Sequence, residues 1–384
     1  MFIGKVQAAD LPSNVRIHLY PNEKAGVWST LVAVASLTFY VGFMNWFIML
    51  CVASFFSRAA LYATIVLLTS LALPAGPVLW PAFTHLWVFS TWRHYFKFSF
   101  LSEEILKPHK RYVLAEFPHG AFPIGAIVAG TTVQILWPSL KIFSLAASSL
   151  FYIPFWRHFM AWIGSVPATR DNFKLLLKKD SVAVVVGGIA EMFLLDKHRE
   201  RLKLKDRRGF CKIAMEEQAD GIVPVYYFGG SKVLDFGPQF MMALSRRSRM
   251  SLGILVGVAG LPIPRPQPIY MVSGIPIPVP RVPLNDPDFE KKVRREVESR
   301  PQASDATTQG PKPRAPCTPA LHHLLLRGVP VRLQDTLHGC AHRTGKAAAN
   351  TVDQLLALVV VEVQALYERH RAEYGWADRP LLIE

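Results

Sequence analysis

Two long runs without a charged side chain restrict what this chain can fold into. The first extends from Ala25 to Ser57 and the second from Ala59 to Trp92, so that only Arg58 separates them. A helix needs about 20 apolar residues to cross the hydrocarbon core of a bilayer. We therefore expect a two-helix membrane hairpin over residues 25–92, with spans near residues 31–55 and 59–80. A re-entrant hairpin and a buried core hairpin are the alternatives.

The distribution of charge indicates which side of the membrane holds the termini and what the chain binds. Two crossings leave both termini on one side, and the basic residues that follow the second run assign that side to the cytosol (Arg93, Lys97, Lys107, Lys110 and Arg111). Lys and Arg number 43 against 28 Asp and Glu, a net charge of +15. A basic chain favours an anionic partner. Because 51% of the residues are hydrophobic, we expect a membrane surface or a phosphorylated ligand, and no nucleic acid.

Beyond the apolar runs, short β-rich segments alternate with helical ones. Strands are expected at residues 112–117, 141–148, 181–186 and 222–228, and helices at residues 169–179 and 206–221. The first of these helices has a capping signal at Thr169 or Asp171. Strands that alternate with helices predict an α/β sheet, here over residues 93–299.

The flanking segments complete the expected organisation. Residues 1–24 precede the hairpin as a cytosolic segment. Residues 300–350 are rich in proline and hold four of the twelve histidines and two of the four cysteines. No sustained period and no standard metal-binding spacing occur there, so the composition predicts a disordered insertion and not a zinc site. Residues 351–384 read as a strong final helix and a tail that complete the α/β domain.

The sequence Phe117-Pro118-His119-Gly120 is the strongest candidate for chemistry. The histidine follows the strand expected at residues 112–117, and α/β folds place reactive groups at the carboxyl ends of strands. Pro118 fixes the turn and Gly120 permits close backbone approach. Because a histidine titrates near working pH, His119 is a candidate general base. A turn or core histidine is the alternative.

Two further groups of residues are candidates for ligand contacts. Gly187, Gly188 and Glu191 follow a buried strand, where glycines free backbone N–H groups to face a ligand or an oxyanion. Arg208, in a basic run near a helix start, and Arg170 are candidate phosphate ligands. A tight turn and a solvated basic face are the alternatives. The motifs of serine hydrolases, P-loops and dinucleotide sites are missing from the sequence.

These residues belong to an ordered series that resembles the type-2 diacylglycerol acyltransferase family, which includes monoacylglycerol and wax-alcohol acyltransferases. The series covers nearly the whole chain apart from residues 300–350 and reads FPHG, TRD, VVVGGIAE, RRGFCKIAM, GIVPVYYFG, SGIPIPV and LYERHRAEYGWAD. The resemblance implies a membrane-embedded helical hairpin followed by a glycerolipid-acyltransferase-like α/β domain with a mixed sheet. It also implies an endoplasmic reticulum membrane protein with cytosolic termini that reaches lipid droplets.

The resemblance also assigns roles to residues. The catalytic residue of the family falls on His119, with substrate-binding or oxyanion motif positions at Pro118, Gly120, Gly187, Gly188 and Glu191, and structural motif positions at Phe117, Gly209, Phe210, Pro224 and Gly229. Many members have His or Glu where this chain has Phe117. Phospholipid-making relatives have Asp five positions after the histidine, where this chain has Ile124. Spacing therefore does not name the partner that orients His119, and Glu191 is a hypothesis.

The expected reaction is direct acyl transfer without a covalent intermediate. His119 would remove the proton from the hydroxyl of diacylglycerol, and the oxygen would attack the thioester of acyl-CoA, with backbone N–H groups near Gly120 or the Gly187–Gly188 pair stabilising the oxyanion. Acyl-CoA is then a co-substrate, with no cofactor and no metal. The partners implied are acyl-CoA, a neutral lipid alcohol, the bilayer and a second copy of the chain. Monoacylglycerol or a long-chain alcohol is the alternative acceptor, and a catalytically inactive membrane or lipid-droplet scaffold is the alternative function.

Overall fold

The fold is that of a computed structural model, which describes residues 16–20, 26–248, 253–280 and 346–384. The chain divides into two units, residues 1–279 with 354–384 and residues 280–353. The elements below belong to the first unit, except for the start of the last helix. The segment expected as an insertion lies outside the described residues as far as residue 345, and so does most of the expected N-terminal segment.

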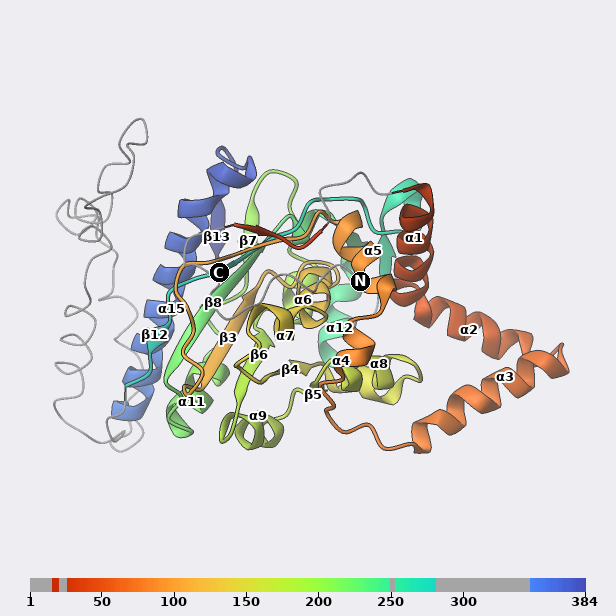
Figure 1. The fold of residues 1–384 in the computed structure, drawn as a ribbon, viewed down its shortest axis with the longest axis horizontal. Helices are drawn as coiled ribbons and strands as arrows, with labels where there is room; N and C mark the ends of the chain where they lie inside the picture. The colour runs from red at the N-terminus through yellow and green to blue at the C-terminus, as the bar shows by residue number, and fades with distance from the viewer. Residues whose placement is uncertain (1–15, 21–25, 249–252, 281–345) are drawn as a thin grey trace. The chain divides into compact units, whose positions relative to one another are not determined.

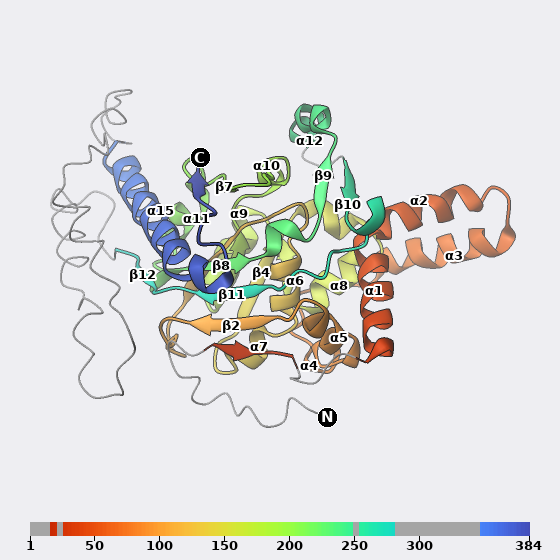
Figure 2. The same cartoon turned by 90° about the horizontal axis from the view of Figure 1, so that it is seen from above.

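A nine-stranded mixed sheet forms the centre of the first unit (Figures 1 and 2). Strands β8, β3, β6, β4 and β5 run parallel in that order, while β11 is antiparallel to β8. The strands are β1 (Ile17–His18), β2 (Ser99–Ser102), β3 (Tyr112–Phe117), β4 (Ile142–Ala146), β5 (Ser165–Pro167), β6 (Ser181–Val185), β8 (Gly221–Phe228), β11 (Tyr270–Ser273) and β12 (Ile277–Pro278). Every residue of β3 is buried, as expected of a central parallel strand. The predicted mixed α/β sheet is confirmed.

Short helices connect and cover these strands. They are α4 (Pro81–Thr84), α5 (Trp87–Tyr95), α6 (Ile124–Gly130), α7 (Val133–Leu136), α8 (Trp156–Trp162), α9 (Arg170–Leu177), α10 (Ile189–Met192), α11 (Gly209–Glu216) and α12 (Met242–Ser248). The predicted cap of α9 is present, because the Thr169 hydroxyl accepts a hydrogen bond from the N–H of Asn172 at 3.2 Å. Strands β9 (Asp235–Gly237) and β10 (Ile254–Val256) pair in an antiparallel manner, and α12 lies between them along the chain.

The first apolar run does not form the straight span expected over residues 31–55. It forms α1 (Val27–Val41) and α2 (Phe43–Ala53), whose axes differ by 69° across Gly42. A side chain at position 42 would lie 2.8 Å from the Thr38 carbonyl oxygen, so glycine permits this tight bend. Helix α1 packs against α5, and its residues Leu37 and Tyr40 are buried in the core. Half of this run is therefore part of the α/β domain, because its apolar face meets protein side chains.

Helices α2 and α3 (Arg58–Thr69) form a hairpin that projects from the rest of the first unit (Figures 1 and 2). Its tip residues Phe55 and Phe56 are 86% and 87% exposed. The second run, expected to span residues 59–80, leaves the α-helix after Thr69 and reaches Pro74 through a short 3-10 turn. Among the described residues no helix by itself has the length and apolarity needed to cross a bilayer. Helices α1 and α2 together have that length and apolarity, but only as a bent pair.

The last helix, α15 (Lys346–Tyr374), begins before the boundary expected at residue 351. From residue 354 onward its buried residues Leu355, Val359 and Val363 recur at helical spacing, and Tyr367 stacks on Phe228 of β8 at 5.4 Å. The following strand β13 (Leu381–Ile383) pairs in parallel with β7 (Glu200–Leu202). The C-terminal residues thus pair with β7, the short strand that follows β6 and α10 in the chain.

Candidate active site

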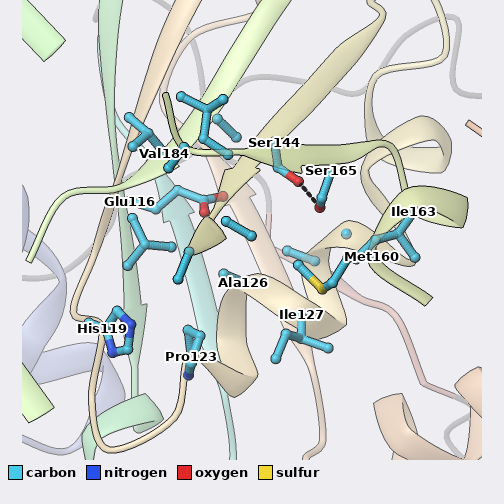
Figure 3. A pocket seen from close by; sticks show the side chains of 18 of the residues that line it. Glu116, His119, Pro123, Ala126, Ile127, Ser144, Met160, Ile163, Ser165 and Val184 are labelled. Carbon is cyan, nitrogen blue, oxygen red and sulfur yellow. Dashed lines mark hydrogen bonds between the residues drawn. The ribbon is translucent and has the colours of Figure 1, made fainter. Parts of the chain in front are cut away.

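A largely apolar cavity of about 600 Å³ lies between the sheet and helices α6 and α8. Its walls include side chains of three neighbouring parallel strands, such as Leu114, Leu145 and Val184. Figure 3 shows His119 on one side of this cavity and Met160 and Ile163 on the other. The volume is in the range of ligand pockets, about 300–1,000 Å³. The cavity can therefore hold an apolar chain beside the imidazole of His119.

His119 lies in the loop that follows β3, as the sequence predicts. Its Nδ1 is 3.0 Å from the carbonyl oxygen of Gly120. A carbonyl oxygen only accepts hydrogen bonds, so in the neutral ring Nδ1 carries the proton and Nε2 keeps its lone pair. Burial lowers the pKa of His119 against the opposing effect of this hydrogen bond. A neutral imidazole with a free Nε2 can accept a proton.

Glu191 holds the loop of His119 by its backbone. The carboxylate is buried and accepts hydrogen bonds from the N–H of His119 at 2.7 Å and of Lys203 at 2.9 Å. Burial raises the pKa of Glu191 to about 7, although these two hydrogen bonds lower it. Glu191, the expected partner of His119, thus contacts its backbone, while the ring contacts the carbonyl oxygen of Gly120. Glu191 thereby fixes where the backbone of the loop lies.

The glycine pair makes room for this carboxylate. A Cβ atom at Gly187 would lie 2.0 Å from Cδ of Glu191. Gly188 has φ 61° and ψ −157°, a conformation that favours glycine. The carbonyl of Gly187 accepts a hydrogen bond from Nη2 of Arg207 at 2.8 Å. These contacts explain both glycines structurally, and their expected role at an oxyanion stays a prediction.

The two arginines predicted to bind phosphate lie outside the cavity wall. Arg170, at the start of α9, is exposed and binds both carboxylate oxygens of Glu216 at 2.8 Å. Arg208 is exposed at the N-terminus of α11. The neighbouring Arg207 is half-buried and lines the cavity. Of this basic run, the side chain that lines the cavity is that of Arg207, and phosphate binding by the run stays a prediction.

The structure also places the remaining predicted residues, and the ligand roles expected of Pro118 and Gly120 stay predictions. Phe117 and Phe210 are buried in the core, and Pro224 lies within the buried strand β8. Gly229 has φ 86°, and a Cβ atom there would lie 2.1 Å from the carbonyl oxygen of Pro268. Gly209 begins α11 with no atom within 4 Å of its Cβ position, while Pro118 and Gly120 border a small pocket behind His119. Among the described residues there is no group of three or more His, Cys, Asp and Glu side chains placed to hold a metal ion.

Sequence reasoning missed Glu116, which lines the cavity from β3. Tyr227 of β8 donates a hydrogen bond from its hydroxyl to Oε1 of Glu116 at 2.7 Å. Burial raises the pKa of Glu116 to about 7, although this hydrogen bond lowers it. The available signal was a single acidic residue within the apolar run YVLAEF.

Comparison with known families decides what kind of protein this is. Residues 48–292 match the family described as diacylglycerol acyltransferase. The chain belongs to the diacylglycerol acyltransferase family. The matched region contains the second half of α2, all of α3, the central strands and the loop of His119. The residues that line the cavity all lie in it, with the exception of Tyr40 in α1.

Individual relatives of this acyltransferase family share part of the chain. Human "Diacylglycerol O-acyltransferase 2-like protein 6" is 29% identical over 50% of this chain and 64% of its own length. "Diacylglycerol O-acyltransferase 2" of Dictyostelium discoideum is 30% identical over 48% and 55%. Mouse "Acyl-CoA wax alcohol acyltransferase 2" is 27% identical over 50% and 64%. The chain thus spans less than two thirds of the length of these relatives. No solved structure matches it.

Proposed function

We propose that this protein is an acyl-CoA-dependent O-acyltransferase that esterifies diacylglycerol to triacylglycerol. One observation carries the proposal: in a chain of this family, Nε2 of His119 has no hydrogen-bond partner among the described residues and lies beside an apolar cavity of about 600 Å³. The cavity suits an acyl chain, and the imidazole suits the removal of a hydroxyl proton.

In the proposed reaction, Nε2 of His119 takes the proton of the acceptor hydroxyl while the hydroxyl oxygen attacks the thioester carbon. The carbon–sulfur bond then breaks, and the CoA thiolate takes the proton from the imidazolium. The Gly120 carbonyl keeps the Nδ1 proton in place throughout. Backbone N–H groups near Gly120 or the Gly187–Gly188 pair stabilise the oxyanion. We assign the CoA phosphates to the basic segment that contains Arg207 and Arg208, and we retain Arg170 as a third candidate. As proposed, acyl-CoA is a co-substrate and no cofactor takes part.

We also propose that the α2–α3 hairpin is embedded in the endoplasmic reticulum membrane, with both termini in the cytosol, and that the protein reaches lipid droplets. The support is the hairpin's composition and exposure. Helix α2 has no charged residue, α3 has only Arg58, and the apolar side chains at the tip are exposed. Exposed apolar surface of this extent is typical of a membrane or protein interface. A diacylglycerol acceptor is dissolved in the bilayer, so a hairpin embedded there would hold the enzyme next to this substrate.

A long-chain alcohol or a monoacylglycerol is the second candidate acceptor. The similarity to a mouse protein named for wax alcohol acyl transfer favours the alcohol. The two acceptors and diacylglycerol share one chemistry at His119 and differ in the groups that the cavity must accommodate. Competition among the three acceptors with oleoyl-CoA separates them.

The test compares three full-length proteins in microsomes of a yeast strain that makes no neutral lipid: wild type, His119→Ala and His198→Ala. His198 is exposed and serves as the matched control. Loss of a general base lowers the rate by about 10²–10⁴-fold, so His119→Ala should make almost no triacylglycerol and His198→Ala should match wild type. Full activity of His119→Ala would refute the assignment of His119 as the general base. If wild type acylates none of the three acceptors, the proposal that the protein is an enzyme is refuted, and the scaffold function is favoured.

A further inference from the structure

The cavity contains one carboxyl group that the reaction above does not use. Residues alternate between the two faces of a strand, so Leu114 and Glu116 of β3 point to the same side, and both line the cavity. Glu116 is the one acidic side chain among the described residues that line it. Figure 3 shows its carboxyl group directed in among the apolar lining side chains.

This carboxyl group is only partly satisfied by the protein. Oε1 accepts the hydrogen bond from Tyr227, whereas Oε2 has no partner among the described residues and is not enclosed by protein atoms, so it faces the cavity. When a lipid fills the cavity, this oxygen is removed from water, which is costly unless it forms a hydrogen bond. Most buried polar atoms in native proteins do have a partner. A partner for Oε2 can come from whatever occupies the cavity.

We propose that Glu116 binds a hydroxyl group of the lipid substrate inside the cavity and thereby selects substrates that carry one. The inference rests on the proposed acyltransferase function. The hydroxyl has two sources: a hydroxylated acyl chain, or the second free hydroxyl of a monoacylglycerol acceptor. In both cases the hydroxyl donates to Oε2 of an ionised Glu116 or accepts from a protonated one.

The chemistry of the group favours a hydroxyl over other ligands. Burial raises the pKa of Glu116 to about 7, so the carboxylate and the protonated acid are both populated near neutral pH. A hydroxyl is both donor and acceptor and can pair with either form. An ammonium group, which only donates, would need the ionised form, and an ester carbonyl, which only accepts, would need the protonated form. The other residues that line the cavity are mostly apolar, so the rest of the ligand should be apolar as well.

The expected selectivity follows from the strength of one such hydrogen bond. A hydrogen bond to a charged or partly charged group corresponds to about a 10- to 100-fold preference. Sites built around a substrate hydroxyl can reject the analogue without it by still more. We expect wild type to prefer the hydroxylated member of at least one substrate pair by about 10- to 100-fold in kcat/KM.

The experiment has two arms with the full-length protein. The first compares stearoyl-CoA with a series of hydroxystearoyl-CoAs that differ in the position of the hydroxyl, with diacylglycerol as acceptor. The second compares monoacylglycerol with a long-chain alcohol of equal length, with stearoyl-CoA as donor. Preference in the first arm assigns the hydroxyl to the acyl chain, and preference in the second assigns it to the acceptor.

The informative variant is the pair Glu116→Leu with Tyr227→Phe, because removing both partners leaves no buried donor unpaired. We expect its kcat/KM ratio between the hydroxylated and the plain member of each pair to fall to about one. Tyr227→Phe alone retains the carboxyl group and should keep the preference. Glu116→Gln retains a hydrogen-bonding side chain and should keep most of it.

Equal kcat/KM ratios for wild type and the double variant in both arms would overturn the inference while leaving the acyltransferase intact. If wild type has no activity with any acceptor, the proposed function fails instead. The same pairs of ligands are then compared by thermal shift, which measures binding without turnover. A larger rise in Tm with the hydroxylated ligand that disappears in the double variant would still support Glu116, and equal shifts would overturn it.

Discussion

The contact between Gly187 and Glu191 allows a quantitative test of how the loop of His119 is held. In Gly187→Ala, the new Cβ would lie 2.0 Å from Cδ of Glu191, so the carboxyl group must move. Its two hydrogen bonds, to the N–H of His119 and of Lys203, would then be lost. Each buried N–H left without a partner costs about 1–3 kcal/mol. The free energy of unfolding should fall by about 2–6 kcal/mol, a large part of a typical total of about 5–15 kcal/mol.

The assay is urea unfolding of the detergent-purified protein in a double-mutant cycle with Glu191→Ala. Once the carboxyl group is gone, the space beside position 187 is empty, so adding Gly187→Ala should cost almost nothing further. Gly209→Ala is the matched control, because no atom lies within 4 Å of its Cβ position and alanine favours the helix that it begins. An unchanged free energy of unfolding in Gly187→Ala, or an equal loss in the Glu191→Ala background, would refute the reasoning.

Three further outcomes are expected. Leu37→Ala should lower the free energy of unfolding by about 2–5 kcal/mol, because Leu37 is fully buried, whereas Phe55→Ala, 86% exposed, should leave it unchanged; equal effects in denaturant titrations would contradict the core position of α1. Burial raises the pKa of Glu116 from 4.5 to about 7, so between these pH values the folded chain still holds a proton that the unfolded chain has released. The free energy of unfolding should therefore fall by about 3 kcal/mol as the pH rises from 4.5 to about 7. Denaturant unfolding at a series of pH values should show that the free energy of unfolding changes less with pH in Glu116→Gln than in wild type. Arg379→Met should destabilise by about 3–5 kcal/mol, because it leaves the buried Glu200 carboxylate without the guanidinium 2.6 Å away; a wild-type Tm would exclude that role.

Local signals in the sequence predicted the central strands and the place of His119. The largely apolar runs SVAVVV and YVLAEF form the central strands β6 and β3, as their composition predicts. Thr169 capped its helix as expected because a cap depends on residues within one turn. His119 follows from the end of β3. These features depend on neighbours along the chain, which a sequence displays directly.

The errors concern contacts between distant segments. An apolar run has the same composition whether lipid or protein covers it. The sequence of residues 27–41 therefore did not predict that α1 packs on α5. Neither did spacing show that Glu191 meets the backbone of His119 across 72 residues. Which of Arg207 and Arg208 lines the cavity depends on how α11 begins against the sheet. Glu116 was hidden because its partner, Tyr227, comes from another strand.

The bend at Gly42 has a consequence for how a lipid would reach the enzyme. Tyr40, at the end of α1, forms part of the cavity wall, and α2 begins at Phe43. With the proposed embedding of the α2–α3 hairpin, the cavity and the bilayer are separated by only a few residues of chain. Lipid would then arrive by lateral diffusion in two dimensions. Its mole fraction in the membrane, and not its amount per volume of solution, would set the degree of saturation.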